Sequence, residues 1–171
     1  MINRRNMLLS ASCACVLPYQ TFAQTAGVVP QALLGQHPAG YYQHAIKLFN
    51  SGRKNDAVFV FYLGQLRYRT HLAARPELPV DQDRALFASL SESVGRPINE
   101  YAFGGLPQLD RTLKAVFAYD TANPDQFTPR ETFPVASRQQ REGMETMRRN
   151  ILSNADDMRR QRKANGLENR N

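Results

Sequence analysis

Apolar residues recur with the 3.6-residue spacing of an α-helix along most of the chain after residue 38. Glycines, prolines and short polar runs interrupt this spacing and mark where one helix ends and the next begins. The pattern predicts a short helical segment at residues 97–103 and longer helices at residues 39–51, 55–74, 81–94, 104–120 and 137–164. No stretch shows the sustained alternation of a half-buried strand. We therefore expect an all-α, single-domain bundle of about five helices with a long C-terminal helix.

The helix predicted at residues 55–74 is apolar on every side. Its large apolar side chains fall on two faces, one with Phe59, Tyr62, Leu63 and Leu66 and the other with Val58, Phe61 and Tyr68. A helix that is apolar all round belongs in the middle of a bundle. Gly64 costs this helix about 1 kcal/mol of propensity relative to alanine. We expect a neighbouring helix to approach closely at that point and to compensate.

Polar side chains interrupt the same helix at Gln65 and Arg67. The buried parts of such side chains must be hydrogen-bonded, so Arg67 is expected to pair with an acid such as Asp120 or Glu100. Arg69 can extend its side chain to solvent. We interpret Gln65, Arg67 and Asp120 as a structural polar core.

The first residues have the three parts of a secretory signal peptide. Arg4 and Arg5 make a basic start, residues 7–17 are apolar, and small residues lead to a cleavage point after Ala23. The paired arginines ahead of an apolar run also resemble a twin-arginine signal. We interpret residues 1–23 as a leader that directs the protein to the periplasm, by either the general-secretion or the twin-arginine route.

Removal of the leader leaves two regions. Residues 24–38 mix Gly, Pro, Gln and Ala and are expected to form a flexible segment, and residues 39–171 form the helical domain. Cys13 and Cys15 lie in the leader, so the mature chain has no cysteine for a disulfide, a metal or a nucleophile. The apolar run of the leader is too short to span a bilayer, and we expect no membrane-spanning helix after cleavage.

The chain is basic, with a net charge of +7. The mature chain without Arg4 and Arg5 keeps +5, and +4 of this lies from Arg138 onward, where nine basic and five acidic residues occur. Export excludes nucleic acid as the partner and leaves anionic cell-wall polymers, lipid headgroups or an acidic protein. A solvated basic face would account for the same charges.

The histidines have no spacing that favours a metal site. His37, His44 and His71 are the only histidines of the chain, and none has a second ligand three or four residues away. The chain also lacks a G-x-S-x-G nucleophile motif. We therefore predict no metal and no cofactor.

One glutamate has a sequence context found in enzymes. Glu92 and Ser93 resemble the catalytic Glu-Ser dipeptide of the lytic transglycosylases, and residues 104–109, GGLPQL, resemble the segment that follows it in that family. The resemblance implies that Glu92 acts as a general acid that protonates a glycosidic oxygen of peptidoglycan. Pro107 departs from the family pattern, which has Met there.

The small size, the leader and the all-α pattern, with the stretch FYLGQLR at residues 61–67, resemble the exported immunity partners of type VI secretion effectors. This resemblance implies a non-enzymatic protein that covers the active site of a toxic effector enzyme in the periplasm. An envelope scaffold or adaptor is a further alternative. Arginine and aromatic side chains dominate binding hot spots, so we predict partner contacts at Arg69, Arg96, Asn99 and Tyr101. The sequence leaves the oligomeric state open.

Overall fold

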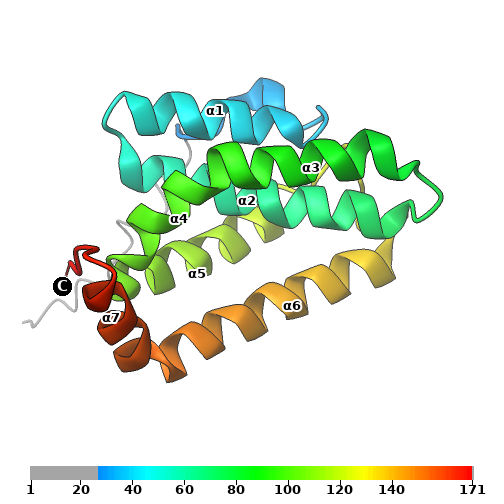
Figure 1. The fold of residues 1–171 in the computed structure, drawn as a ribbon. Coiled ribbons are helices and arrows are strands. Elements are labelled where there is room, and N and C mark those ends of the chain that lie inside the picture. Colours follow the sequence, from blue (N-terminus) through cyan, green and yellow to red (C-terminus); the bar gives the residue numbers. More distant parts are fainter. Residues whose placement is uncertain (1–26, 171) are drawn as a thin grey trace, which may run out of the picture.

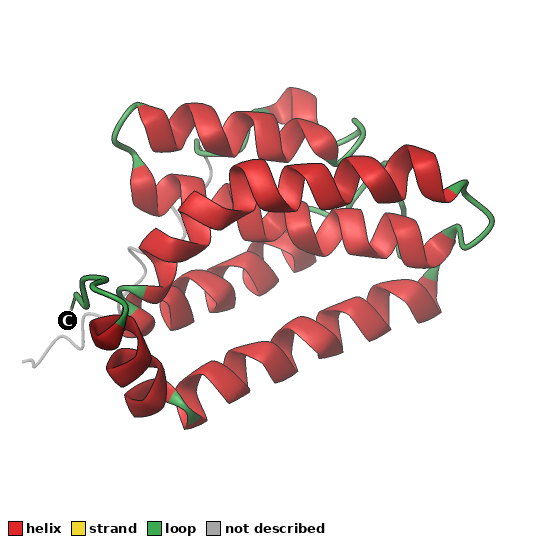
Figure 2. Cartoon of the chain, viewed as in Figure 1, coloured by secondary structure: helices red, strands yellow, loops and turns green. Residues whose placement is uncertain are grey.

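The computed structural model describes residues 27–170, and the predicted signal peptide lies outside them. These residues form a helical bundle without strands, which confirms the predicted fold class (Figures 1 and 2). The helices are α1 (Ala39–Asn50), α2 (Lys54–Ala74), α3 (Ala85–Leu90), α4 (Arg96–Phe103), α5 (Leu106–Ala122), α6 (Pro134–Ser153) and α7 (Ala155–Ala164), with a short 3-10 helix at Gln31–Leu33 and π-helical turns at Val80–Arg84 and Ser91–Gly95.

Helix α2 lies at the centre of the bundle. It packs against α1, α4, α5 and α6, and α1 and α6 lie on opposite sides of it (Figure 1). Val60, Phe61 and Leu63 have no solvent exposure, although they point in different directions around the helix. The predicted central helix at residues 55–74 is therefore confirmed, because an all-round apolar surface can be buried only where helices surround it.

Gly64 is where α1 crosses α2 most closely. A Cβ atom built on Gly64 would lie 2.5 Å from the Cβ of Tyr41, which is closer than two nonbonded carbon atoms approach. Only glycine fits this crossing without movement of one helix. The contact explains why a residue of low helix propensity stands in the middle of a long helix.

The segment at residues 24–38, expected to be flexible, packs on the bundle over the part that the structure describes. Val28, Val29 and Leu34 are nearly inaccessible to solvent. The backbone N–H of Gln126 donates to the carbonyl of Leu34 at 3.1 Å, and His44 bonds the carbonyl of Val28 through Nε2 at 3.0 Å. Apolar residues between the Gly and Pro positions of this segment account for its burial.

Three of the predicted helical segments have clearly different bounds in the structure. The last one, expected at residues 137–164, is divided at Asn154, whose φ of −108° and ψ of 19° end α6. The Asn154 side chain donates to the carbonyl of Asn150 at 2.8 Å, and such side-chain bonds compete with the helical backbone. The helices expected at residues 81–94 and 97–103 instead run on into one another through the π-helical turn Ser91–Gly95.

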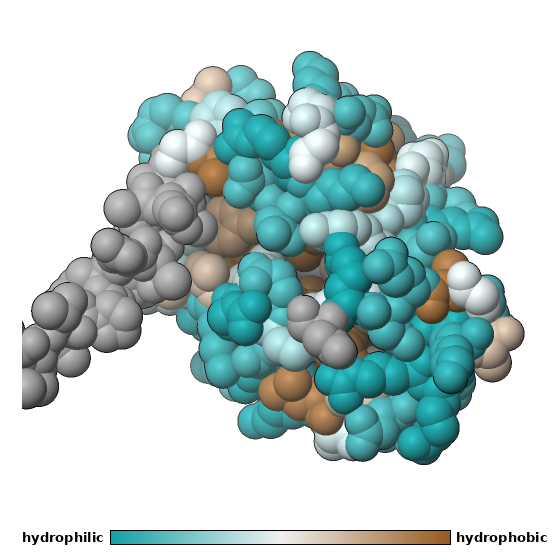
Figure 3. All heavy atoms as spheres, turned by 90° about the vertical axis from the view of Figure 1, so that its left-hand side faces the viewer, coloured by the Kyte–Doolittle hydropathy of each residue, from teal (hydrophilic) through white to brown (hydrophobic). Residues whose placement is uncertain are grey.

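One face of the molecule is predominantly polar. The face at the α7 end of the bundle is largely hydrophilic, and its apolar patches are small and separate (Figure 3). Within residues 27–170, none of the helices has both the length and the apolarity that crossing a bilayer requires.

The Gly64 crossing generates a stability prediction. Gly64→Ala should lower the free energy of unfolding by about 1–3 kcal/mol, because the added methyl group overpacks the contact with Tyr41. Gly143→Ala is the matched control, since Gly143 lies in α6 and a Cβ atom added there would meet no atom within 4 Å, and this change should gain up to about 1 kcal/mol. Urea denaturation of both variants would measure the difference. A Gly64→Ala protein as stable as the wild type would show that α1 and α2 do not meet there.

Candidate functional site

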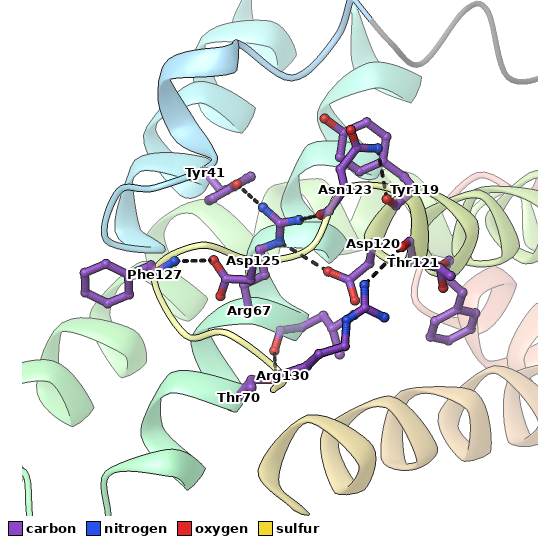
Figure 4. Close-up of polar contacts among 12 residues, drawn as sticks. Tyr41, Arg67, Thr70, Tyr119, Asp120, Thr121, Asn123, Asp125, Phe127 and Arg130 are labelled. Atoms are coloured by element: carbon purple, nitrogen blue, oxygen red, sulfur yellow. Dashed lines mark hydrogen bonds and ion pairs between the residues drawn. The ribbon is translucent and has the colours of Figure 1, made fainter. Parts of the chain in front are cut away.

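Arg67 is the most deeply buried charged group of the described chain, with 1% of its surface exposed. Its Nε donates to Asp120 Oδ1 at 3.3 Å, its Nη1 donates to the hydroxyl of Tyr41, and its Nη2 donates to the carbonyl of Asn123 (Figure 4). The acid that it meets is one of the two expected from the sequence. Gln65, the third residue of the predicted polar core, is half-buried and takes no part in these bonds.

Tyr41 extends this network to the N-terminal segment. Its hydroxyl donates to the carbonyl of Leu33 at 3.0 Å while it accepts from Arg67. Burial raises the pKa of Tyr41 to about 12, so the hydroxyl keeps its proton and the donor role at neutral pH. Arg67 thus connects four parts of the chain, namely the N-terminal segment, α1, the end of α5 and the loop at residues 123–133.

Arg141 brings α6 into the same network. Its Nη1 lies 3.6 Å from Asp120 Oδ2, and its Nη2 donates to the carbonyl of Phe117 and to the hydroxyl of Thr121, each at 3.0 Å. Its guanidinium also lies over the Phe117 ring, 5.1 Å from the ring centre. Asp120 therefore forms ion pairs with two arginines, the buried Arg67 on α2 and the half-buried Arg141 on α6.

A cavity of about 270 Å³ lies beside Arg67, between α2, the loop at residues 123–133 and the start of α6. Four arginines and two aspartates line it, namely Arg67, Arg130, Arg138, Arg141, Asp120 and Asp125. Leu66, Pro124 and Pro134 supply apolar lining, and Thr70, Thr128 and Ser137 complete it. This combination of an apolar wall and directed cationic donors is typical of a binding site for an anionic group.

Asp125 lines the cavity but forms no ion pair within residues 27–170. Its Oδ1 accepts the backbone N–H of Phe127 at 3.1 Å, while its Oδ2 is buried without a hydrogen-bond partner in the described part of the chain. Burial raises the pKa of Asp125, and this outweighs the opposite effect of Arg67. Of the two aspartates, only Asp120 forms ion pairs with arginines of the cavity.

The predicted partner contacts lie elsewhere on the molecule, and none of them lines this cavity. Arg69 is exposed and its guanidinium lies 5.8 Å from the centre of the Phe87 ring. Arg96 is exposed on α4, whereas Asn99 accepts a bond from Tyr62 at 2.9 Å. The Tyr101 hydroxyl donates to Asn55 at 3.1 Å. Arg69 and Arg96 are thus exposed, Arg96 in an ion pair with Glu92, while Asn99 and Tyr101 are engaged within the fold.

Glu92 lies on the surface in the turn before α4. Its side chain is 72% exposed and forms an ion pair with Arg96 at 2.9 Å. A catalytic general acid of a glycosidase gains its raised pKa from an apolar, desolvated pocket. The Glu92 side chain is not buried, and Glu92 lines neither the cavity beside Arg67 nor the two other hollows described for residues 27–170.

Three residues that the sequence did not bring together form a second polar cluster. His37 comes from the N-terminal segment, His71 from the last turns of α2, and Asp83 from the turn Val80–Arg84. His71 Nε2 lies 2.8 Å from Asp83 Oδ2, and His37 Nε2 lies 3.3 Å from Asp83 Oδ1. Pro76 and Pro79 follow α2, where the chain turns back and brings Asp83 against the end of the helix. These two prolines are the sequence signal that could have indicated the turn.

The three side chains lie close enough together to bind a metal ion. Their hydrogen bonds, however, favour a histidine tautomer that cannot bind a metal through the nitrogen facing Asp83. Arg75 donates to His71 Nδ1 at 2.8 Å, and the backbone N–H of Ala39 donates to His37 Nδ1 at 3.2 Å. An arginine and a backbone amide can only donate, so each neutral ring carries its proton on the Nε2 that faces Asp83. A metal on Nε2 needs the proton on Nδ1, with an acceptor beside it. The cluster therefore fits a structural clamp better than a metal centre.

Comparisons with protein-family models, with curated proteins and with solved structures give no match to this chain.

The histidine clamp generates a pH prediction. Burial is the main cause that lowers the pKa of His71, and Arg75 adds to it, while Asp83 opposes it. Above the ordinary histidine value of 6.5, His71 is neutral in both the folded and the unfolded chain. As the pH falls below that value, the unfolded chain takes up the proton first, so the free energy of unfolding should decrease.

Denaturation curves between neutral and mildly acidic pH would measure this decrease. His71→Gln keeps a donor for Asp83 but does not titrate, and it should reduce the pH dependence. His44→Gln, outside the clamp, is the control and should leave that dependence in place. The interpretation fails if His71→Gln and the wild type lose stability in parallel over this range.

Proposed function

We propose that this chain is an exported, non-enzymatic binding protein that acts in the periplasm, where it covers a site on another protein as an immunity protein covers the active site of a toxic effector enzyme. The proposal joins the predicted leader and the all-α pattern to the basic cavity beside Arg67. The proposal takes the partner to be a protein, because the cavity is lined by arginines and arginine is enriched in the hot spots of protein interfaces.

The observation that carries the proposal is that two of the four arginines lining the cavity are held in place by the fold. Arg67 is held by Tyr41, Asp120 and Asn123, and Arg141 is held by the α5 backbone. Side chains that are ordered before binding lose less entropy on association. Arginine is also enriched in the hot spots of protein interfaces. Arg69 and Arg96 remain predicted contacts at a separate part of the surface.

A muramidase that uses Glu92 is less well supported, because the Glu92 carboxylate is in water and already paired with Arg96. The envelope scaffold shares the binding activity of our proposal and differs only in the target. The enzymatic activity of the partner distinguishes the two binding functions. An immunity protein abolishes that activity when it binds, and a scaffold does not.

The enzyme and the binder make opposite predictions for Glu92→Gln. The loss of a general acid lowers a rate by about 10²–10⁴-fold, whereas a binder should be unaffected because Gln is nearly isosteric with Glu. The mature protein should release no products from peptidoglycan and should retain one stoichiometric partner from periplasmic extract, in the wild type and in Glu92→Gln alike. Glu100→Gln, an exposed neighbour, is the matched control. Peptidoglycan cleavage by the wild type that only Glu92→Gln abolishes would establish the enzyme instead.

A further inference from the structure

Two hollows adjoin along α6, and Arg141 lines both of them. The first is the cavity beside Arg67, and the second, of about 380 Å³, is lined by Phe117, Arg141, Glu142, Glu145 and Arg149. We call the two together the α6 cleft. Its α6 lining runs from Pro134 to Arg149, which is about 22 Å along the helix axis. A ligand the size of one metabolite would fill only one of the hollows.

The first hollow has more basic than acidic side chains, because four arginines and two aspartates line it. Arg138 is exposed and makes no ion pair or side-chain hydrogen bond within residues 27–170. Arg130 has Glu131 at 3.6 Å, and Arg141 has Asp120 at 3.6 Å. The same Asp120 bonds Arg67 at the shorter distance of 3.3 Å. An additional carboxylate among Arg130, Arg138 and Arg141 would therefore be stabilised.

The second hollow has a different character. The Phe117 ring supplies its apolar surface, and its charges are of both signs. Glu145 is already engaged by Arg148, with two oxygen–nitrogen distances of 2.9 and 2.8 Å. This half of the α6 cleft suits an apolar side chain rather than a second anion.

We propose that the α6 cleft binds an acidic segment of the partner protein, with one carboxylate among Arg130, Arg138 and Arg141 and a following apolar side chain against Phe117. The inference rests on the proposed function and adds the chemistry of the partner. About seven residues in an extended conformation cover the length of the cleft. The part of this chain outside the structure cannot supply the segment, because residues 1–26 contain no Asp or Glu.

The test uses the mature chain and a fluorescein-labelled peptide of about seven residues, in which two glutamates precede alternating leucines and serines. Fluorescence anisotropy at low salt measures binding, and a counterpart with two lysines in place of the glutamates controls for charge. We expect the glutamate peptide to bind and the lysine peptide not to bind. Arg138→Ala should weaken binding about tenfold, because one charge-assisted hydrogen bond is lost.

Arg138→Ala should leave the fold and its stability unchanged, since the Arg138 side chain is exposed and makes no hydrogen bond or ion pair within the described fold. Arg160→Ala on α7 removes the same charge from an exposed arginine away from both hollows, so it should bind the glutamate peptide as the wild type does. No binding of either peptide, or an equal loss in both variants, would overturn the proposal. The proposal would also be overturned if free glutamate displaced the peptide at the concentrations at which the peptide binds, because that result indicates a small-molecule site. Self-association that Arg138→Ala abolishes would overturn it in favour of a second copy of this chain.

The inference and the proposed function can fail separately. A partner captured from periplasmic extract equally well by the wild type and by Arg138→Ala would overturn the role of the α6 cleft and leave the binding function standing. Specific binding of the glutamate peptide by a protein that captures no partner would support the cleft and contradict the proposed function.

Discussion

The buried guanidinium of Arg67 is the constraint on which the rest of the structure depends. A charge removed from water is tolerated only where partners surround it, and the partners of Arg67 come from α1, the end of α5 and the loop at residues 123–133. Once α2 is in the centre of the bundle, these three parts must take fixed positions around one side chain. Tyr41 also fixes the position of the N-terminal segment, because its hydroxyl donates a hydrogen bond to the carbonyl of Leu33.

The same constraint shapes the surface available for binding. The loop at residues 123–133 forms one wall of the cavity and α6 forms another, and Asp120 connects them because it contacts both Arg67 and Arg141. The opposite end of the loop is held by Arg75, which donates to Thr128 at 3.2 Å and lies over the Phe133 ring. A loop fixed at both ends presents its cationic neighbours in a defined geometry, and this lowers the entropic cost of binding.

The helices could be predicted from the sequence because each has a periodic apolar face, and α2 could be placed at the centre because it has apolar residues on every face. The pairing of Arg67 followed from the same reasoning, since a buried arginine requires an acid. The cavity could not be predicted, because its walls include an irregular, proline-rich loop that has no periodicity. The His37, His71 and Asp83 clamp depends on three segments meeting in space. The division of the last helix depends on one side-chain bond of Asn154 that competes with the backbone.

Hydrogen exchange of the Arg67→Lys protein tests most directly whether Arg67 orders the binding surface. Lysine keeps the positive charge, but its one nitrogen cannot replace the three separate nitrogens with which Arg67 bonds Asp120, Tyr41 and Asn123. The account predicts a folded protein in which amides of the loop at residues 123–133 exchange faster, with Gln126 and Phe127 the most affected because their N–H groups bond Leu34 and Asp125. The amides in the middle of α6 should keep their protection. Unchanged exchange throughout the loop in a folded Arg67→Lys protein would contradict the account.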